Sequence, residues 1–176
     1  MIIDFLYLSA NLKKIPRQGW IDKLSINNPE SVADHVFSMA VMGMIFSDME
    51  NLNTEKILKM ILLHDLAESV IGDIPPEQIS KDNKFAIENK TMKNILKNLP
   101  KTIQKQYGLL WEEYQSNNSK EAKIVHELDK LEMALQARIY SKEGHSEEML
   151  TPFFKSSKNA IVDVKLLKLF KKICEK

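Results

Sequence analysis

The sequence has few of the residues that would mark a secreted, sheet-rich or nucleic-acid-binding protein. A single cysteine, Cys174, occurs among 176 residues, so an internal disulfide is excluded and we expect a reducing, cytoplasmic setting without a catalytic thiol. Only five glycines occur, and alternating β-branched runs are rare, which argues against a sheet. The formal net charge of +1 gives no electrostatic footprint for a nucleic-acid polymer or an anionic membrane.

Long hydrophobic runs are also scarce. We find no apolar run that approaches the roughly 20 residues needed to cross a bilayer, and no membrane partner is expected. The N-terminal stretch MIIDFLYLSANLKK is apolar, but Asp4 interrupts it, and a basic leader and a small-residue cleavage site are lacking. We interpret it as an amphipathic helix. The chain length favours one domain that spans residues 1–176.

Helical periodicity, by contrast, recurs along the whole chain. It predicts helices at 1–13, 29–50, 55–68, 82–98, 101–115, 117–144 and 159–176. Asn28 is the expected N-cap of the second helix, with Pro29 at its first position, and Thr54 is the expected cap of the third. Segments 70–82 and 145–158 are expected to be loops. The pattern predicts an all-α, single-domain, multi-helix orthogonal bundle.

Candidate metal ligands fall inside these helices. The chain has four histidines, and two of them, His35 and His64, lie in apolar helical segments. Imidazole nitrogens and carboxylate oxygens are standard ligands of divalent transition metals. His64 and Asp65 are about 100° apart around a helix, so both can reach one ion beside it. His35 and Asp129 would complete the set from two other helices. Each residue alone is more often structural, and only the combination points to a metal.

The order His35, His64–Asp65 and Asp129 resembles the signature of the HD-domain metal-dependent phosphohydrolases. The segments RQGW, PESVADHVFSMA, LLHDLAESVIGDIPP and ELDKLEMALQA are similar to the 5′-deoxynucleotidase branch of that family, which acts on nucleoside monophosphates. The resemblance covers residues from about 5 to 140. It implies the HD-domain fold, a metal bound by these four residues, and a homodimer.

The resemblance also implies roles for four further residues. Glu68 matches an acidic residue placed to handle protons at the substrate, and Asp73 matches an acidic residue close to the bound nucleotide. Arg17 and Trp20 fall in the segment of the branch's substrate-contacting arginine and tryptophan. Arg17 is one of two arginines among 25 basic residues, and its planar fork suits a phosphate. For Trp20, a wall for the sugar or base and plain core packing remain equally open.

We therefore expect a metal-dependent 5′-nucleotidase that hydrolyses (deoxy)ribonucleoside 5′-monophosphates, deoxy preferred, to nucleoside and phosphate. One divalent ion is expected, because four histidines are few for a dinuclear site. Mn²⁺, Co²⁺, Fe²⁺, Ni²⁺ and Zn²⁺ all suit mixed nitrogen and oxygen ligands. Two alternatives stay open. The first is an HD phosphohydrolase for another small phosphate ester or a nucleoside di- or triphosphate, and the second is a non-catalytic metal-binding helical module.

Other notable residues receive structural interpretations. His126 lies three residues before Asp129, and we expect it at the surface or beside the ligands, without a place among them. Arg138 is expected to make a structural ion pair or an interface contact. The methionines of the second predicted helix are expected to fill the core: Met39, Met42, Met44 and Met49.

Overall fold

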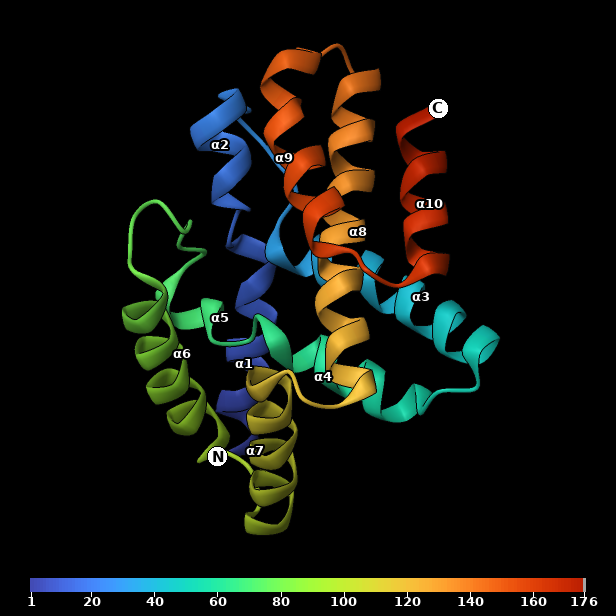
Figure 1. Ribbon diagram of the computed structural model, residues 1–176. Helices are drawn as coiled ribbons and strands as arrows, with labels where there is room; N and C mark the ends of the chain where they lie inside the picture. Colours follow the sequence, from blue (N-terminus) through green and yellow to red (C-terminus); the bar gives the residue numbers. More distant parts are fainter. Residues whose placement is uncertain (176) are drawn as a thin grey trace.

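The computed structural model describes residues 1–175, and apart from one isolated bridge between Pro16 and Ser31 its regular structure is helical (Figure 1). The elements are α1 (Ile2–Asn11), η1 (Leu12–Lys14), α2 (Gln18–Leu24), α3 (Val32–Glu50), α4 (Thr54–His64), α5 (Glu68–Ile71), α6 (Lys81–Leu96), α7 (Lys101–Ser116), α8 (Lys120–Lys142), α9 (Glu147–Ala160) and α10 (Val164–Glu175). The predicted all-α multi-helix bundle is confirmed.

Helices α3, α4 and α8 form the centre of the bundle. In Figure 1, α8 runs along the molecule, with α9 and α10 beside its C-terminal half and α7 near its N-terminal end. Fully buried aliphatic side chains fill the space between α3, α4 and α8, among them Met39, Ile57, Ile61 and Leu128. Burial of each such side chain stabilises the fold by about 1.5–3 kcal/mol. This core holds the three helices that carry the candidate ligands.

The prediction of a loop over 145–158 is wrong, because this segment forms most of α9. Leu150, Phe153 and Ser157 are buried at helical spacing against α8. Pro152 lies inside the helix on its exposed side. Packing of an apolar face on α8 outweighs the local cost of a proline.

Several helix ends also differ from prediction. The short helix α2 was not expected. Helix α3 begins at Val32, where Ser31 and Asp34 form a capping box, so Asn28 and Pro29 precede it. Asn53 caps α4, and Thr54 is its first residue. Helix α4 ends at His64, and α5 begins only at residue 68. The predicted helix 159–176 is split by residues 161–163, and its last residue lies outside the described part of the chain.

Helix α3 is long and apolar enough to cross a membrane by length and composition, so the expectation that no run approached this length is wrong. A core helix passes the same test, and one face of α3 is buried through Val32 and Met39. The opposite face exposes Met44 and Met49, so the prediction that these two methionines fill the core is also wrong. Only Met39 and the partly buried Met42 contact the core.

The contact between α3 and α4 depends on Gly43. A Cβ at this position would collide with Ile61 Cδ1 and lie 3.1 Å from Ile57 Cγ2, and both isoleucines are fully buried. We expect Gly43→Ala to lower the free energy of unfolding by about 1–3 kcal/mol through overpacking. Urea denaturation measures this change. Gly108→Ala is the control, since a Cβ at Gly108 has no atom within 4 Å and should stabilise α7 by about 0.5–1 kcal/mol. Equal effects of both substitutions would contradict the packing argument.

Candidate metal centre

A cavity of about 350 Å³ lies where α2, α4, α8 and α9 meet the loop that follows α5. Seven of the eight predicted site residues line it: Arg17, Trp20, His64, Asp65, Glu68, Asp73 and Asp129. The eighth, His35, is fully buried, and its Nε2 lies 3.3 Å from Asp129 Oδ1 at the cavity wall. The fold thus brings together residues from four separate parts of the sequence.

The four candidate ligands come from three helices. His35 lies in the first turn of α3, His64 is the last residue of α4, Asp65 is the C-cap of α4, and Asp129 lies in the middle of α8. His64 Nδ1 is 2.6 Å from the carbonyl oxygen of Ile61, so the N–H at Nδ1 donates to the backbone and Nε2 faces the carboxylates. Because α4 ends at His64, the backbone of Asp65 is no longer helical, and its side chain lies beside His64.

The imidazoles and carboxylates converge closely. His64 Nε2 is 3.1 Å from Asp65 Oδ2, and His35 Nε2 is 3.8 Å from the same oxygen. One ligand atom each of His35, His64 and Asp129 lies within 4.8 Å of the others. Both Nε2 atoms are buried without a hydrogen-bond partner, which is rare unless such an atom has another function. These three residues supply two nitrogen donors and one oxygen donor, and Asp65 lies beside both imidazoles, so the residues present fit one divalent transition-metal ion.

The two carboxylates stay ionised despite their burial. Burial opposes ionisation of Asp129, but Lys130, His35 and Arg17 hold its pKa well below the usual range. Lys130 Nζ is 3.0 Å from Asp129 Oδ2. The pKa of Asp65 is also lowered, mainly by His64 and then by Arg17, whose Nη1 is 3.4 Å from Asp65 Oδ2. Burial and Arg17 act to lower the pKa of His35, but Asp129 and Glu132 outweigh them and raise it to about 9, so binding of a cation at this imidazole would release its proton.

Glu68 is a buried carboxyl group in the wall of the cavity. It begins α5, and its Oε2 has no hydrogen-bond partner. Burial, and then the charges of Asp65 and Asp73, raise the pKa of Glu68 well above its ordinary value. Lys84 Nζ lies 3.9 Å from Glu68 Oε1 and acts in the opposite direction. A carboxyl group whose pKa is raised in this way is suited to proton transfer.

Asp73 connects the loop after α5 to the segment that carries Arg17. Its Oδ2 accepts a hydrogen bond of 2.8 Å from the backbone N–H of Gln18, the first residue of α2. This contact caps an otherwise uncapped helix start directly after Arg17. Asp73 lines the cavity, and the contact that the structure gives it is with the protein backbone. Its position is therefore suited to holding Arg17 in place.

Trp20 is mainly a core residue with one side at the cavity. It is only 2% exposed, stacks on Phe153 with ring centroids 4.1 Å apart, and donates through Nε1 to Glu30 Oε1 at 2.8 Å. Core packing thus accounts for most of its surface. Its contribution to the cavity wall is shared with Phe153 and Met133.

Other lining residues escaped the sequence analysis, chiefly Lys84, Glu88, Tyr114, Lys130, Met133 and Phe153. Met133 lies one turn after Asp129 on α8, so helical spacing from Asp129 was a usable signal. Phe153 had no such signal, because the sequence predicts a loop over its segment. His126 also lines the cavity, and its Nε2 is 3.0 Å from the carbonyl oxygen of Tyr114.

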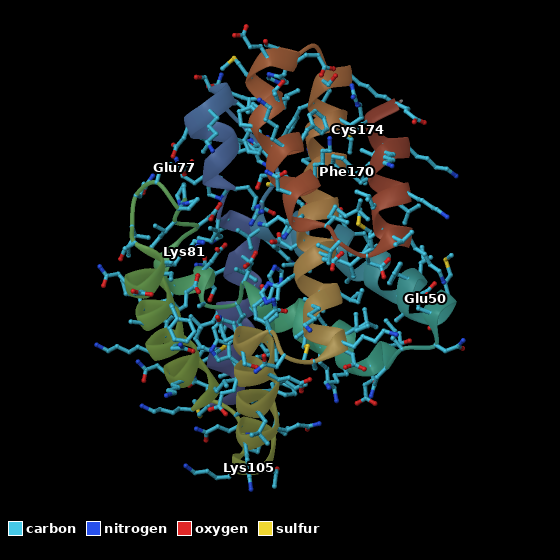
Figure 2. All side chains as sticks on the ribbon, viewed as in Figure 1. Glu50, Glu77, Lys81, Lys105, Phe170 and Cys174 are labelled. Atoms are coloured by element: carbon cyan, nitrogen blue, oxygen red, sulfur yellow. The ribbon has the colours of Figure 1, made fainter. Side chains whose placement is uncertain are left out.

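Arg138 and Cys174 lie outside the cavity lining. Arg138 pairs with Glu147 at 2.8 Å and donates to the carbonyl oxygens of Ile173 and Cys174, as expected for a structural ion pair. Figure 2 shows Cys174 on α10, across the molecule from Glu77, which lies on the loop beside the cavity. The thiol therefore takes no part in this site.

Known proteins share both the sequence and the fold. The model of the HD domain family matches residues 9–168. The human 5′-deoxynucleotidase HDDC2 is 41% identical over 157 residues, which cover 89% of this chain and 76% of the human protein. Its counterpart from Danio rerio is 38% identical over 175 residues, or 99% of this chain and 86% of the relative.

Two solved structures have the same arrangement of helices. A conserved hypothetical protein from Pyrococcus furiosus superposes with a TM-score of 0.80 at 29% identity, over 99% of each chain. The PH0347 protein from Pyrococcus horikoshii OT3 gives a TM-score of 0.72 at 34% identity, over 98% of this chain and 96% of its own. The matched family model, these relatives and the site geometry agree, and this chain is a member of the HD-domain family, in the group that includes the 5′-deoxynucleotidases HDDC2.

Proposed function

We propose that this protein is a metal-dependent 5′-deoxynucleotidase, which hydrolyses (deoxy)nucleoside 5′-monophosphates, deoxy preferred, to nucleoside and phosphate. One observation carries the proposal: the buried, unpartnered Nε2 atoms of His35 and His64 face two ionised carboxylates at the wall of a cavity that also contains a guanidinium. Relatives that cover most of the chain are named for this activity.

His35, His64, Asp65 and Asp129 would hold one divalent ion. When bound, such an ion supplies charge neutralisation for the phosphate dianion and lowers the pKa of a water molecule at its open coordination position. The mixed donor set suits Mn²⁺, Co²⁺, Fe²⁺, Ni²⁺ or Zn²⁺. The set is not the all-oxygen arrangement that Mg²⁺ prefers.

Four further residues of the cavity would each have a separate role toward the substrate. Arg17 presents its guanidinium beside Asp65 and Asp129, where it would bind phosphate oxygens through two parallel N–H groups. Glu68 would give its proton to the 5′-oxygen of the nucleoside as the phosphorus–oxygen bond breaks. Asp73 would hold the backbone next to Arg17 in place through its hydrogen bond with the N–H of Gln18. Trp20, with Phe153, would form the apolar wall against which a deoxyribose packs.

The metal set is tested by Asp65→Ala. We expect the purified variant to lose bound metal and its phosphate release from a panel of nucleoside mono-, di- and triphosphates to fall to background, because one ligand and its charge are removed. Elemental analysis and a phosphate assay measure both quantities. His145→Ala is the control and should keep both, since His145 lies outside the cavity lining. Equal turnover in wild type and Asp65→Ala would refute the proposal, and turnover of triphosphates alone would favour the alternative substrate class.

Arg17 and Glu68 are expected to affect different kinetic constants. Arg17→Lys keeps the charge but loses the planar fork, so KM for a deoxynucleoside monophosphate should rise about 10-fold for one lost hydrogen bond of ~1.5 kcal/mol. Glu68→Gln removes the transferable proton, so kcat should fall about 10²–10⁴-fold with little change in KM. Steady-state kinetics separate the two constants. The comparison variant is Glu88→Gln, another cavity carboxylate, which should lower kcat much less. A reversed pattern of KM and kcat effects would contradict these roles.

We propose a homodimer that uses the exposed apolar face of α3, and a cytoplasmic location that fits the free thiol of Cys174. The face consists of Phe37, Val41, Met44, Ile45 and Met49, which recur at helical spacing. An apolar stripe on one helix can pair with its own copy around a two-fold axis.

Ile45→Glu tests this interface. A buried charge at its centre should convert the dimer to a monomer in sedimentation velocity, because each copy would place the glutamate against an apolar partner. Leu109→Glu, at an exposed leucine of α7, should remain dimeric. A wild-type protein that sediments as a monomer at all concentrations would exclude the homodimer.

A further inference from the structure

A buried carboxylate lies behind the candidate metal centre, on the side of His35 that faces away from the cavity. Glu132 is 1% exposed, and its Oε2 is 2.5 Å from His35 Nδ1. Glu132 does not line the cavity and so is placed out of reach of a substrate there. It lies three residues after Asp129 on α8, so one helix carries both a ligand and a group in contact with another ligand.

Core packing alone does not account for Glu132. Burial of a carboxylate costs several kcal/mol unless the group is paired, and an aliphatic side chain of similar volume would fill the same space. Among the described residues, the hydrogen-bond partner of its side chain is the imidazole of His35. The cost of burial is therefore offset through one contact, and that contact is with a metal-ligand candidate.

The contact determines which nitrogen of His35 is free. A carboxylate oxygen accepts a hydrogen bond, so the proton of a neutral imidazole is held at Nδ1 and the lone pair remains at Nε2. Nε2 is the atom that faces Asp129 and Asp65, and it has no hydrogen-bond partner. The backbone carbonyl of Ile61 does the same for His64. The two histidines are thus oriented alike, one by a neutral carbonyl and one by a charged carboxylate.

We propose that Glu132 is a positioning residue of the metal centre, which fixes the tautomer and ring orientation of His35 and increases the basicity of its Nε2. This role rests on the metal site proposed above, in which Glu132 would contact the ligand His35 and not the ion itself. Outer carboxylates of this kind typically change metal affinity by about 10–100-fold.

A second carboxylate extends the contact toward the cavity wall. Glu30 lies within 4.8 Å of His35 and Glu132, and its Oε1 accepts the hydrogen bond from Trp20 Nε1. The backbone N–H of Glu30 donates to the Tyr140 hydroxyl at 2.9 Å. Glu30 is thereby held from two sides, and its carboxylate lies beside that of Glu132 and beside the imidazole of His35.

The test measures metal binding and not turnover. Glu132→Leu should weaken Co²⁺ binding about 10–100-fold in calorimetry and alter the visible spectrum of the Co²⁺ protein. Glu132→Gln should lose less affinity, because its amide oxygen still accepts from Nδ1. The control is Glu127→Gln, at another buried glutamate of α8, which accepts from the backbone of Val162 and Asp163 and should bind Co²⁺ as the wild type does.

Long-range ¹H–¹⁵N spectra of the Zn²⁺-loaded protein give a second measurement. This measurement does not depend on whether Glu132→Leu folds. His35 should carry its proton on Nδ1 and the metal on Nε2, and Glu132→Gln should shift the Nδ1–H resonance of His35 but not that of His64. Coordination of His35 through Nδ1, or wild-type Co²⁺ affinity in both Glu132 variants, would overturn the inference. A wild type that binds no Co²⁺ would instead contradict the metal site itself.

Discussion

Two ionised carboxylates held close to the same imidazoles inside the bundle are the constraint on which the rest of the structure depends. Asp65 and Asp129 are largely buried, and each lies within 4 Å of His35 Nε2. Such a concentration of negative charge is unfavourable in a low-dielectric interior unless cations compensate it. Arg17 and Lys130 supply positive charge at the edge of the group. The Nε2 atoms of the two imidazoles face these carboxylates and complete a donor set that suits a divalent ion.

The same charge distribution gives the neighbouring residues different protonation states. The pKa values of Asp65 and Asp129 are lowered by the cationic groups beside them, whereas burial and the charges of Asp65 and Asp73 raise the pKa of the more deeply buried Glu68. A single cavity therefore contains carboxylates that bind a cation and a carboxyl group that exchanges a proton. This separation is what hydrolysis of a phosphate ester requires, since the phosphate dianion needs neutralisation and its leaving oxygen needs a proton.

The packed helices α3, α4 and α8 hold the residues of the site in fixed positions. α8 carries the candidate ligand Asp129 and also Glu132, which contacts His35, and α4 carries His64 together with the carbonyl of Ile61 that orients it. The close contact of α3 with α4 at Gly43 fixes the distance between the helices that carry the two histidines. Another wall of the cavity is formed by α9 and the loop after α5, through Phe153 and Asp73.

The helical character was predictable from the sequence, because hydrophobic period is a local property. The four candidate ligands were chosen from their residue types and their order in the chain, and the resemblance to the HD-domain family added the acidic and basic residues around them. Sequence patterns did not predict α9, because its packing on α8 stabilises it. They also placed the ends of α3 and α4 wrongly, because side-chain caps decide where those helices begin. It left the role of Trp20 open and did not identify Glu132 at all. A buried glutamate one turn from a ligand looks like any other polar residue on a helix. Only the tertiary structure brings it against His35, since that contact joins residues 97 positions apart.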